Sequence, residues 1–344
     1  MYYFAYFLTF YFQPVQNKAD MSLSQNSSSV YPEYFFIIGL SGIHNSNYYY
    51  MFLCITYFVT VTGNSLVLLL IALYRSLHSP KYIGVFNLAL ADFGETNALI
   101  PNMMKTFLFD SQYISYNACL ANMFFVHFFS TVQSFTLVVL AYDRFIAIFL
   151  PLRYHAIVNY TFMYFVFSII WVFNASIVAF AVSLITRLSF CESNKVNGYY
   201  CDYGPVYRLA CNDNSICASM AQLSAALYVV APVIIIVLSY LGIFLALSKI
   251  TTWEGRLKAL KTCVSHLLLV GSFFLPIICI FIATSTNSLS LNARVISTSL
   301  AHALPPMLHP IIYVLNTAEI KDIIIKIVRN KCLPVRKNIL KLRK

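Results

Sequence analysis

Long apolar runs separated by short polar stretches dominate the chain. Seven runs are about 20 residues or longer, which suits a helix that rises ~1.5 Å per residue and must cross ~30 Å of hydrocarbon. They cover residues 49–73, 82–106, 119–143, 162–185, 217–247, 261–284 and 291–315. The pattern predicts an all-α membrane protein with a seven-transmembrane helix bundle.

Prolines interrupt several of these runs. A proline removes one helical hydrogen bond, but neighbouring helices in a bundle can satisfy the carbonyl that it frees. The prolines inside the predicted helices are Pro101, Pro232, Pro276, Pro305, Pro306 and Pro310. We expect kinks at these positions, because the apolar pattern continues through each of them.

Composition supports a membrane protein and excludes a soluble one. Apolar residues make up 60% of the 344 residues and charged residues only 10%, which no soluble domain of this length needs. With an extracellular N-terminus, 17 Lys and Arg residues would face the cytoplasm and six would face outside. The net charge of +11 is therefore a sign of topology and does not indicate nucleic-acid binding.

Three parts follow from this topology. Residues 1–48 are predicted to form an extracellular N-terminal segment, residues 49–315 the membrane domain, and residues 316–344 a basic cytoplasmic tail. The tail is expected to begin with a short amphipathic helix that lies on the membrane lipids of the inner leaflet. Residues 1–20 resemble neither a signal peptide nor a span, so both Met1 and Met21 remain open as the true start.

Glycosylation and cysteine positions bear on the same orientation. Of the Asn-x-Ser/Thr sequons, the one at Asn26 lies in the extracellular segment and is the expected glycosylation site. Cys119 lies at the outer start of the third span, and Cys191, Cys201 and Cys211 lie in the loop before the fifth. Four cysteines allow three pairings. A zinc site is the weaker alternative, because no histidine accompanies the loop cysteines and this compartment is oxidising; no metal is expected.

Several phrases resemble those of known receptors. Gly63-Asn64, Leu88-Ala89-Leu90-Ala91-Asp92 and Asp143-Arg144-Phe145 resemble motifs of rhodopsin-like G-protein-coupled receptors. More specific are Leu140-Ala141-Tyr142-Asp143-Arg144-Phe145-Ile146-Ala147-Ile148, Lys258-Ala259 with Thr262-Cys263-Val264-Ser265-His266, and Pro306-Met307-Leu308-His309-Pro310-Ile311-Ile312-Tyr313. In this order they resemble the olfactory receptor family over residues 35–325. The aromatic content and the histidine in the last phrase suggest a fish-type member.

The resemblance carries expectations of its own. It implies disulfides between Cys119 and Cys201 and between Cys191 and Cys211. It also implies a receptor in the plasma membrane that binds a small odorant, activates a stimulatory heterotrimeric G protein and raises cyclic AMP. Neither an enzymatic activity nor a cofactor is expected. Cys332 in the tail is a candidate for acylation.

A charged pair at the end of the third span is the expected switch. Charges at a membrane margin are usually functional, and Arg144 can pair with Asp143 or, after a helix shift, with other partners. The resemblance implies that Arg144 meets Tyr240 and Tyr313 when the receptor opens to the G protein. Lys258 and Lys261 would line that opening, although the positive-inside rule alone also accounts for these two lysines.

Polar residues within the spans predict a second functional layer. Asn64, Asp92, Gln133 and His309 are expected to form a polar core. The resemblance implies an asparagine at the position of His309, and an acid is frequent at that of Gln133. A charge-assisted pair of Asp92 with His309 would compete with a sodium ion and would make signalling sensitive to mildly acidic pH.

The ligand site follows from counting helical turns away from Arg144 and the prolines. The expected ligand-binding residues are Val126, His127, Ser130, Thr131, Ser224, Tyr228, Phe274, Ile277, Ile278, Phe281, Ser299 and His302. Such a site suits a small, partly apolar ligand. The two histidines would either contact an acidic or thiol ligand or be satisfied within the bundle.

Other functional classes fit less well. A transporter should show repeated halves and several coupling charges, and an enzyme should show a nucleophile with a base or a metal cluster. The chain has an odd number of spans and one pair of acids, Asp92 and Glu95, within a span. A non-olfactory rhodopsin-like receptor for a peptide or lipid is the nearest alternative, since it would share the general motifs.

Overall fold

The computed structural model describes residues 31–39, 46–109, 112–191, 193–248, 253–285, 289–327 and 329. The two possible start residues, the glycosylation site at Asn26 and the acylation candidate Cys332 all lie outside these ranges.

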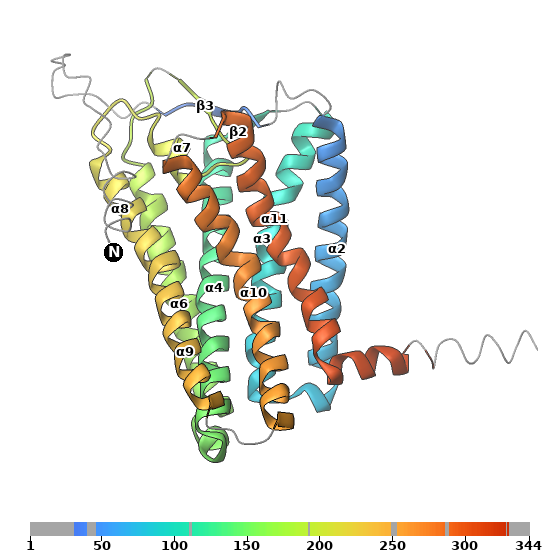
Figure 1. The fold of residues 1–344 in the computed structure, drawn as a ribbon. Helices are drawn as coiled ribbons and strands as arrows, with labels where there is room; N and C mark the ends of the chain where they lie inside the picture. Colours follow the sequence, from blue (N-terminus) through green and yellow to red (C-terminus); the bar gives the residue numbers. More distant parts are fainter. Residues whose placement is uncertain are drawn as a thin grey trace, which may run out of the picture.

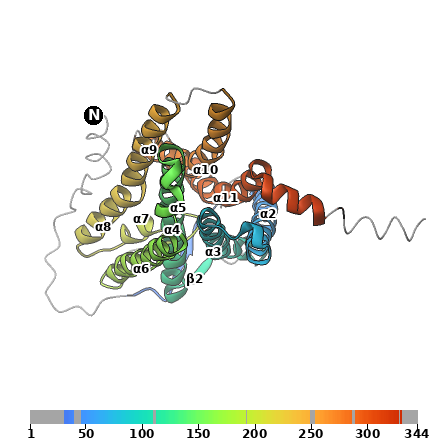
Figure 2. The same cartoon turned by 90° about the horizontal axis from the view of Figure 1, so that it is seen from below.

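Long helices stand side by side in the described part of the chain, one for each predicted span (Figure 1). They are α2 (Ser46–Leu73), α3 (Pro80–Phe109), α4 (Tyr116–Phe149), α6 (Tyr160–Ile185), a fifth composed of α8 (Ser215–Ala225), η3 (Ala226–Val230) and α9 (Ala231–Ser248), then α10 (Trp253–Ser285) and α11 (Leu291–Asn316). Seen from below, α4 stands between α3, α6 and α9 and contacts all three (Figure 2). α4 is therefore the central helix of the bundle, and α3, α6 and α9 pack against it.

Short elements close the two ends of the bundle. At the Arg144 end lie η1 (Arg75–Leu77), η2 (Pro151–Arg153) and α5 (Tyr154–Ile157), and residues 318–327 form a further helix after α11. The opposite end, which we call the disulfide end, holds α7 (Tyr203–Tyr207). The helix of residues 318–327 is docked by its buried Ile320 and Ile323.

A small sheet at the disulfide end departs from the all-α prediction. Strand β1 (Tyr34–Ile37) pairs antiparallel with β2 (Tyr113–Ser115) and parallel with β3 (Lys195–Val196). The strands are two to four residues long, which is too short for an alternating pattern to predict them. Phe35 of β1 is fully buried, so the sheet fixes the N-terminal segment across the end of the bundle.

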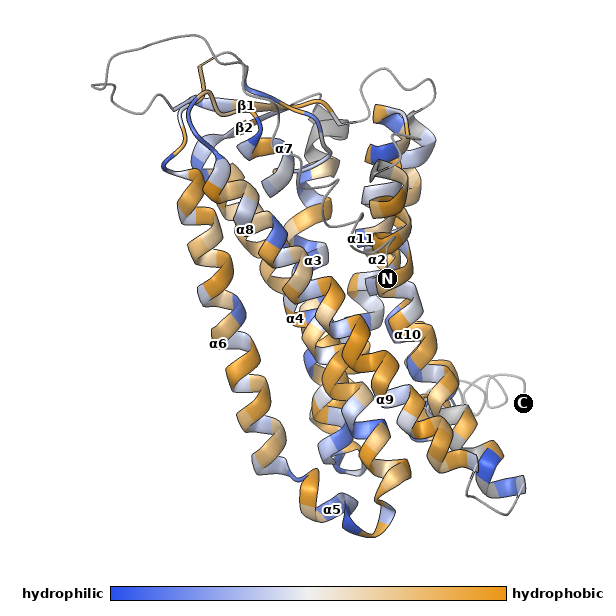
Figure 3. Ribbon diagram, turned by 60° about the vertical axis from the view of Figure 1, so that its left-hand side comes forward, coloured by the Kyte–Doolittle hydropathy of each residue, from blue (hydrophilic) through white to orange (hydrophobic). Residues whose placement is uncertain are grey.

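The outer faces of the bundle are apolar, as a lipid environment requires (Figure 3). Within the described residues, five helices are long and apolar enough to cross a membrane: α2, α4, α6, the combined α8–α9 and α10. The other two expected spans, α3 and α11, fall short of that measure. Their buried Asp92, Glu95 and His309 lower the hydropathy of these helices while facing the bundle interior.

Two prolines show how the bundle compensates for a broken helical bond. Pro310 cannot bond the carbonyl of Pro306, and Asn64 of α2 donates from Nδ2 to that carbonyl at 2.9 Å. Pro232 likewise frees the carbonyl of Tyr228, to which Ser134 Oγ of α4 donates at 2.7 Å. The expected neighbour compensation is therefore present at both sites.

Gly63 allows the first of these contacts. A Cβ atom at Gly63 would lie 2.9 Å from Cγ and 3.1 Å from Cβ of Pro310, and a proline ring cannot rotate away. Alanine normally stabilises a helix relative to glycine, but here it should push α11 from α2 and lower the stability of the purified protein by about 1–3 kcal/mol. Thermal unfolding of Gly63→Ala measures the effect. Gly204→Ala is the control, since its Cβ would meet no atom within 4 Å; equal stability of the two variants would contradict the packing argument.

Candidate functional site

The predicted charged switch lies at the end of α4. Arg144 Nη1 is 3.6 Å from Oδ2 of Asp143, which is almost fully buried. The hydroxyl of Tyr154 in α5 donates to Asp143 Oδ1 at 2.7 Å. Burial raises the pKa of Tyr154, and the neighbouring Asp143 carboxylate raises it further, so the hydroxyl stays a donor. Asp143 is thus held by both its neighbour and the adjoining loop.

His266 links three helices beside this switch. Its Nε2 lies 3.1 Å from the carbonyl oxygen of Leu137 in α4, and its Nδ1 lies 2.8 Å from the hydroxyl of Tyr240 in α9. A carbonyl only accepts, so Nε2 carries the proton and, in the neutral ring, Nδ1 accepts from Tyr240. The two rings also stack, with planes 12° apart. We call His266, Tyr240 and the Leu137 carbonyl the α4–α9–α10 link.

The sequence alone did not indicate a role for His266, although this residue lies in a phrase that resembles the olfactory receptor family. Tyr240 was expected to meet Arg144, but in this arrangement the link occupies its hydroxyl. Tyr313, the other expected partner, is buried in the same apolar cluster as Leu137. The side chains of Lys258 and Lys261 lie outside the described residues.

The helix after α11 is fixed to the start of α3. Lys81 Nζ lies 3.1 Å from Oε1 of Glu319, a partly exposed pair. A backbone hydrogen bond at Glu319 and the contact with Lys81 hold the pKa of this carboxyl below its ordinary value. Screening by solvent makes the pair weak in itself. It still sets the direction in which this helix leaves the bundle.

The polar core forms as two separate groups. His309 Nδ1 lies 2.9 Å from Oδ2 and 3.1 Å from Oδ1 of Asp92, and both side chains are fully buried. Asn64 donates to the carbonyl of Pro306 in α11, which has no helical partner because of Pro310. Gln133 does not join this pair, because its Nε2 donates to Glu95 Oε2 at 2.6 Å. The pH-sensitive signalling expected from Asp92 and His309 stays a prediction.

Removing one partner of the Asp92–His309 pair should be costly. A buried charge left without its partner costs about 3–5 kcal/mol, whereas replacing both partners is often much cheaper. We expect His309→Leu to unfold at a markedly lower temperature than the double variant Asp92→Asn/His309→Leu. Thermal unfolding in detergent checks this. A double variant no more stable than His309→Leu would show that the two side chains are not coupled.

Glu95 is a second residue, besides His266, whose contacts the sequence did not predict. It is buried, and besides Gln133 it contacts Nδ1 of His302 at 2.7 Å. The acid was recognised in the sequence only as a charge within a span. Its three-residue spacing from Asp92 places both on one face of α3, which is the signal that could have found it. Glu95 connects α3, α4 and α11.

The disulfide end positions a third acid–histidine pair. Cys119 is bonded to Cys201 and Cys191 to Cys211, the pairing that the family resemblance implies. Asp202 follows Cys201 directly, and its Oδ1 lies 3.2 Å from His127 Nε2 of α4. Burial raises the pKa of Asp202, but His127, with His302 and Tyr200, outweighs it and holds the pKa below its ordinary value. Both predicted ligand histidines therefore face acids of the chain itself, the second of the two alternatives.

Four of the remaining predicted ligand residues lie in two apolar clusters. Val126 packs with Tyr199 and Tyr200 of the loop. Phe274 belongs to the larger cluster, to which α2, α3, α4, α9, α10 and α11 contribute, and Ile277 and Ile278 pack against it. Ser299 bonds the hydroxyl of Tyr49, Tyr228 packs edge-on against Phe135, and Thr131 bonds its own helix. Ser130, Ser224 and Phe281 are half-buried.

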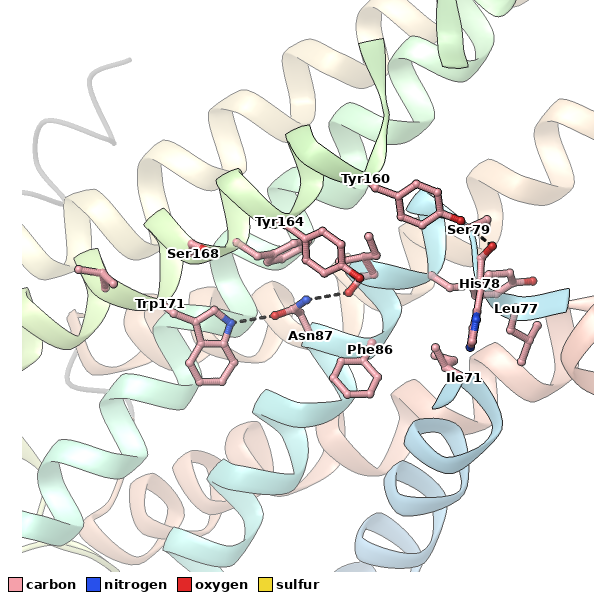
Figure 4. Close-up of a pocket in the computed structure, with 14 residues that line it drawn as sticks. Ile71, Leu77, His78, Ser79, Phe86, Asn87, Tyr160, Tyr164, Ser168 and Trp171 are labelled. Atoms are coloured by element: carbon pink, nitrogen blue, oxygen red, sulfur yellow. Dashed lines mark hydrogen bonds between the residues drawn. The ribbon is translucent and has the colours of Figure 1, made fainter. Parts of the chain in front are cut away.

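A groove of about 810 Å³ opens elsewhere, between α3 and α6 near the Arg144 end (Figure 4). Trp171 Nε1 donates to Asn87 Oδ1 at 2.8 Å on its wall, and the Tyr160 hydroxyl donates to the carbonyl of His78. None of the predicted ligand residues lines it. The groove belongs to the apolar outer surface of the bundle and is separate from the acid–histidine pairs.

Comparisons with known proteins agree with one another. A sequence model of the olfactory receptor family matches residues 53–331. The mouse (Mus musculus) protein "Olfactory receptor 1M1" is 34% identical over 86% of this chain and 95% of its own length. Its human (Homo sapiens) namesake is 35% identical over 82% and 89%, and mouse "Olfactory receptor 5AP2" is 32% identical over 89% and 96%.

Among solved structures, squid rhodopsin has a similar fold. The TM-score is 0.67 at 16% sequence identity, with 81% of this chain and 85% of the rhodopsin chain covered. At this identity the likeness concerns the arrangement of helices alone.

Proposed function

Because the chain belongs to the olfactory receptor family of G-protein-coupled receptors, we propose that it binds a small odorant between the helices of its outer half and raises cyclic AMP through a stimulatory G protein. Membership makes it a multi-pass receptor of the plasma membrane that signals without enzymatic activity and has odorants and G proteins as partners. The match confirms the resemblance drawn from the sequence.

The observation that carries the proposal is the α4–α9–α10 link beside Arg144. His266 holds α10 against α4 through the Leu137 carbonyl and occupies the Tyr240 hydroxyl. When the link opens, α10 can move away from α4 and Tyr240 can turn to Arg144. The cleft so formed would accept a helix of the G-protein α subunit, with Lys258 and Lys261 at its rim.

Charge distribution supports the orientation in this proposal. With an extracellular N-terminus, the Arg144 end and the helix of residues 318–327 face the cytoplasm together with 17 of the Lys and Arg residues. Lys321 and Lys326 of that helix are exposed while Ile320 and Ile323 are buried. This arrangement suits an amphipathic helix beside the anionic inner leaflet. The disulfides then lie in the oxidising extracellular space.

A cell assay tests the proposed function. The chain is expressed at the surface with an olfactory-type stimulatory α subunit, and cyclic AMP is measured with amino acids, small acids, amines, alcohols and steroids. We expect a concentration-dependent rise with at least one class, and no rise in cells that lack the α subunit. Confirmed surface expression without response to any class would contradict the proposal.

A further inference from the structure

The acid–histidine pairs at the disulfide end define the charge that a ligand would meet. Among the described residues, only histidines form ion pairs with Glu95 and Asp202. Two carboxylates and two imidazoles give a net charge between −2 and zero, whatever the protonation of the histidines. A ligand carboxylate would therefore meet no net positive charge here, whereas a cation would be attracted.

Asp202 is the accessible acid of the four groups. Its side chain is 29% exposed and that of His127 is 31% exposed, while Glu95 is only 2% exposed. Asp202 precedes α7 at the N-cap position, where aspartate normally caps the helix with its side chain. Here it makes no capping bond and turns to His127 instead. The Asp202 side chain thus points into the bundle instead of capping α7.

The backbone that carries Asp202 is held firmly. Cys201 is bonded to Cys119 at the start of α4, and the backbone N–H of Cys201 donates to Asn122 Oδ1 at 3.3 Å. Asn122 in turn donates to the carbonyl of Ala98 in α3 at 2.7 Å. A carboxylate fixed in this way loses little entropy when a ligand binds it.

Aromatic rings and polar atoms without hydrogen-bond partners complete a site that suits a cation able to donate hydrogen bonds. The ring of Tyr200 lies 6.2 Å from that of His127 and 5.8 Å from that of His302, between the two pairs. Aromatic rings beside carboxylates are the surroundings that bind ammonium groups. Fully buried Gln133, whose Nε2 holds Glu95, has no partner for its Oε1. His127 Nε2, although near Asp202, makes no hydrogen bond of good geometry, so a better donor can replace it.

We propose that the ligand is a small amine whose ammonium group binds Asp202 beside Tyr200 and His127, with Glu95 as a second negative charge deeper in the bundle. This inference rests on the proposed receptor function and names the ligand class of the same site. It agrees with the alternative that the two histidines are satisfied within the bundle and disfavours the other, an acidic ligand, because both histidines already face acids.

The test compares probes that differ only in their polar group. Hexylamine, hexanol and hexanoic acid form one set, and phenethylamine, phenethyl alcohol and phenylacetic acid another. Each is tested for thermal stabilisation of the purified receptor and for cyclic AMP in cells. An amine of either set should stabilise the wild type more than its alcohol and acid do. Asp202→Asn should weaken the amine effect about tenfold to a hundredfold, and Asp202→Glu should retain most of it.

Controls separate this inference from the proposed function. Asp213→Asn removes another acid of the same loop, fully exposed and bonded to Ser215, and should leave amine binding unchanged. Amine stabilisation without cyclic AMP would keep the inference and contradict the proposed function. Responses to alcohols or acids alone, or an undiminished amine effect in folded Asp202→Asn, would overturn the inference. So would the absence of stabilisation by both amines.

Discussion

Replacing Arg144 with alanine is expected to abolish ligand-stimulated cyclic AMP while the receptor still reaches the cell surface. Arg144 is 22% exposed at the end of α4 and pairs only loosely with Asp143 at 3.6 Å, so its guanidinium remains available for other partners. Charge-assisted bonds from its five donors are the strongest contacts that this end of α4 can offer a G protein. Without this group the open state loses its main contact with the G protein, so the response should fall to background at every ligand concentration.

The effect of Arg144→Ala is measured as cyclic AMP against ligand concentration at matched surface levels. Arg75→Ala is the control, because Arg75 is an exposed base in η1 at the same end of the bundle. Its removal changes the local charge by the same amount without touching α4. An Arg144→Ala receptor that signals like Arg75→Ala would contradict the role given to the switch.

Replacing His266 with leucine is expected to raise basal cyclic AMP. The change removes both hydrogen bonds that His266 makes in the α4–α9–α10 link, to the Leu137 carbonyl and to the Tyr240 hydroxyl, and leaves that hydroxyl only the Cys263 carbonyl at 3.2 Å. A net hydrogen bond is worth about 1 kcal/mol, and a loss of 1–2 kcal/mol shifts an equilibrium roughly 5–30-fold. Since these bonds exist only while α10 is close to α4 and α9, their loss favours the open state.

Basal cyclic AMP per surface receptor checks this second prediction. Ser272→Ala is the matched control on the same helix, because within the described part of the chain the Ser272 hydroxyl bonds only the carbonyl of Leu269 in α10 itself. The control should signal like the wild type. Basal activity in His266→Leu that is equal to or lower than that of Ser272→Ala would show that the link does not restrain the receptor.

The apolar runs predicted where the membrane helices lie but not where each helix begins and ends. The third run was expected at 119–143, and α4 extends over Tyr116–Phe149; the sixth was expected at 261–284, and α10 begins at Trp253. Hydropathy registers the part of a helix that lies in lipid, whereas a helix continues wherever its backbone bonds do. The strands β1 to β3 escaped notice because their pairing joins segments far apart in the sequence.

The sequence predicted which polar residues form the site better than it predicted which residues they contact. Sequence reasoning selected Asp92, His309, His127 and His302 because polar groups in spans need partners. It could not assign Gln133 to Glu95 or His127 to Asp202, since those pairings depend on helix rotation and on how the disulfides place the loop. The contacts of His266 could not be predicted for the same reason.

Nucleotide exchange on a purified stimulatory G protein tests the central claim most directly. The purified receptor is mixed with the heterotrimer, and GTP analogue binding is followed with and without a compound that raises cyclic AMP in cells. The account predicts ligand-dependent exchange with the wild type, faster ligand-free exchange with His266→Leu, and exchange at background with Arg144→Ala. Wild-type exchange that the ligand does not accelerate, or that persists undiminished in Arg144→Ala, would contradict it.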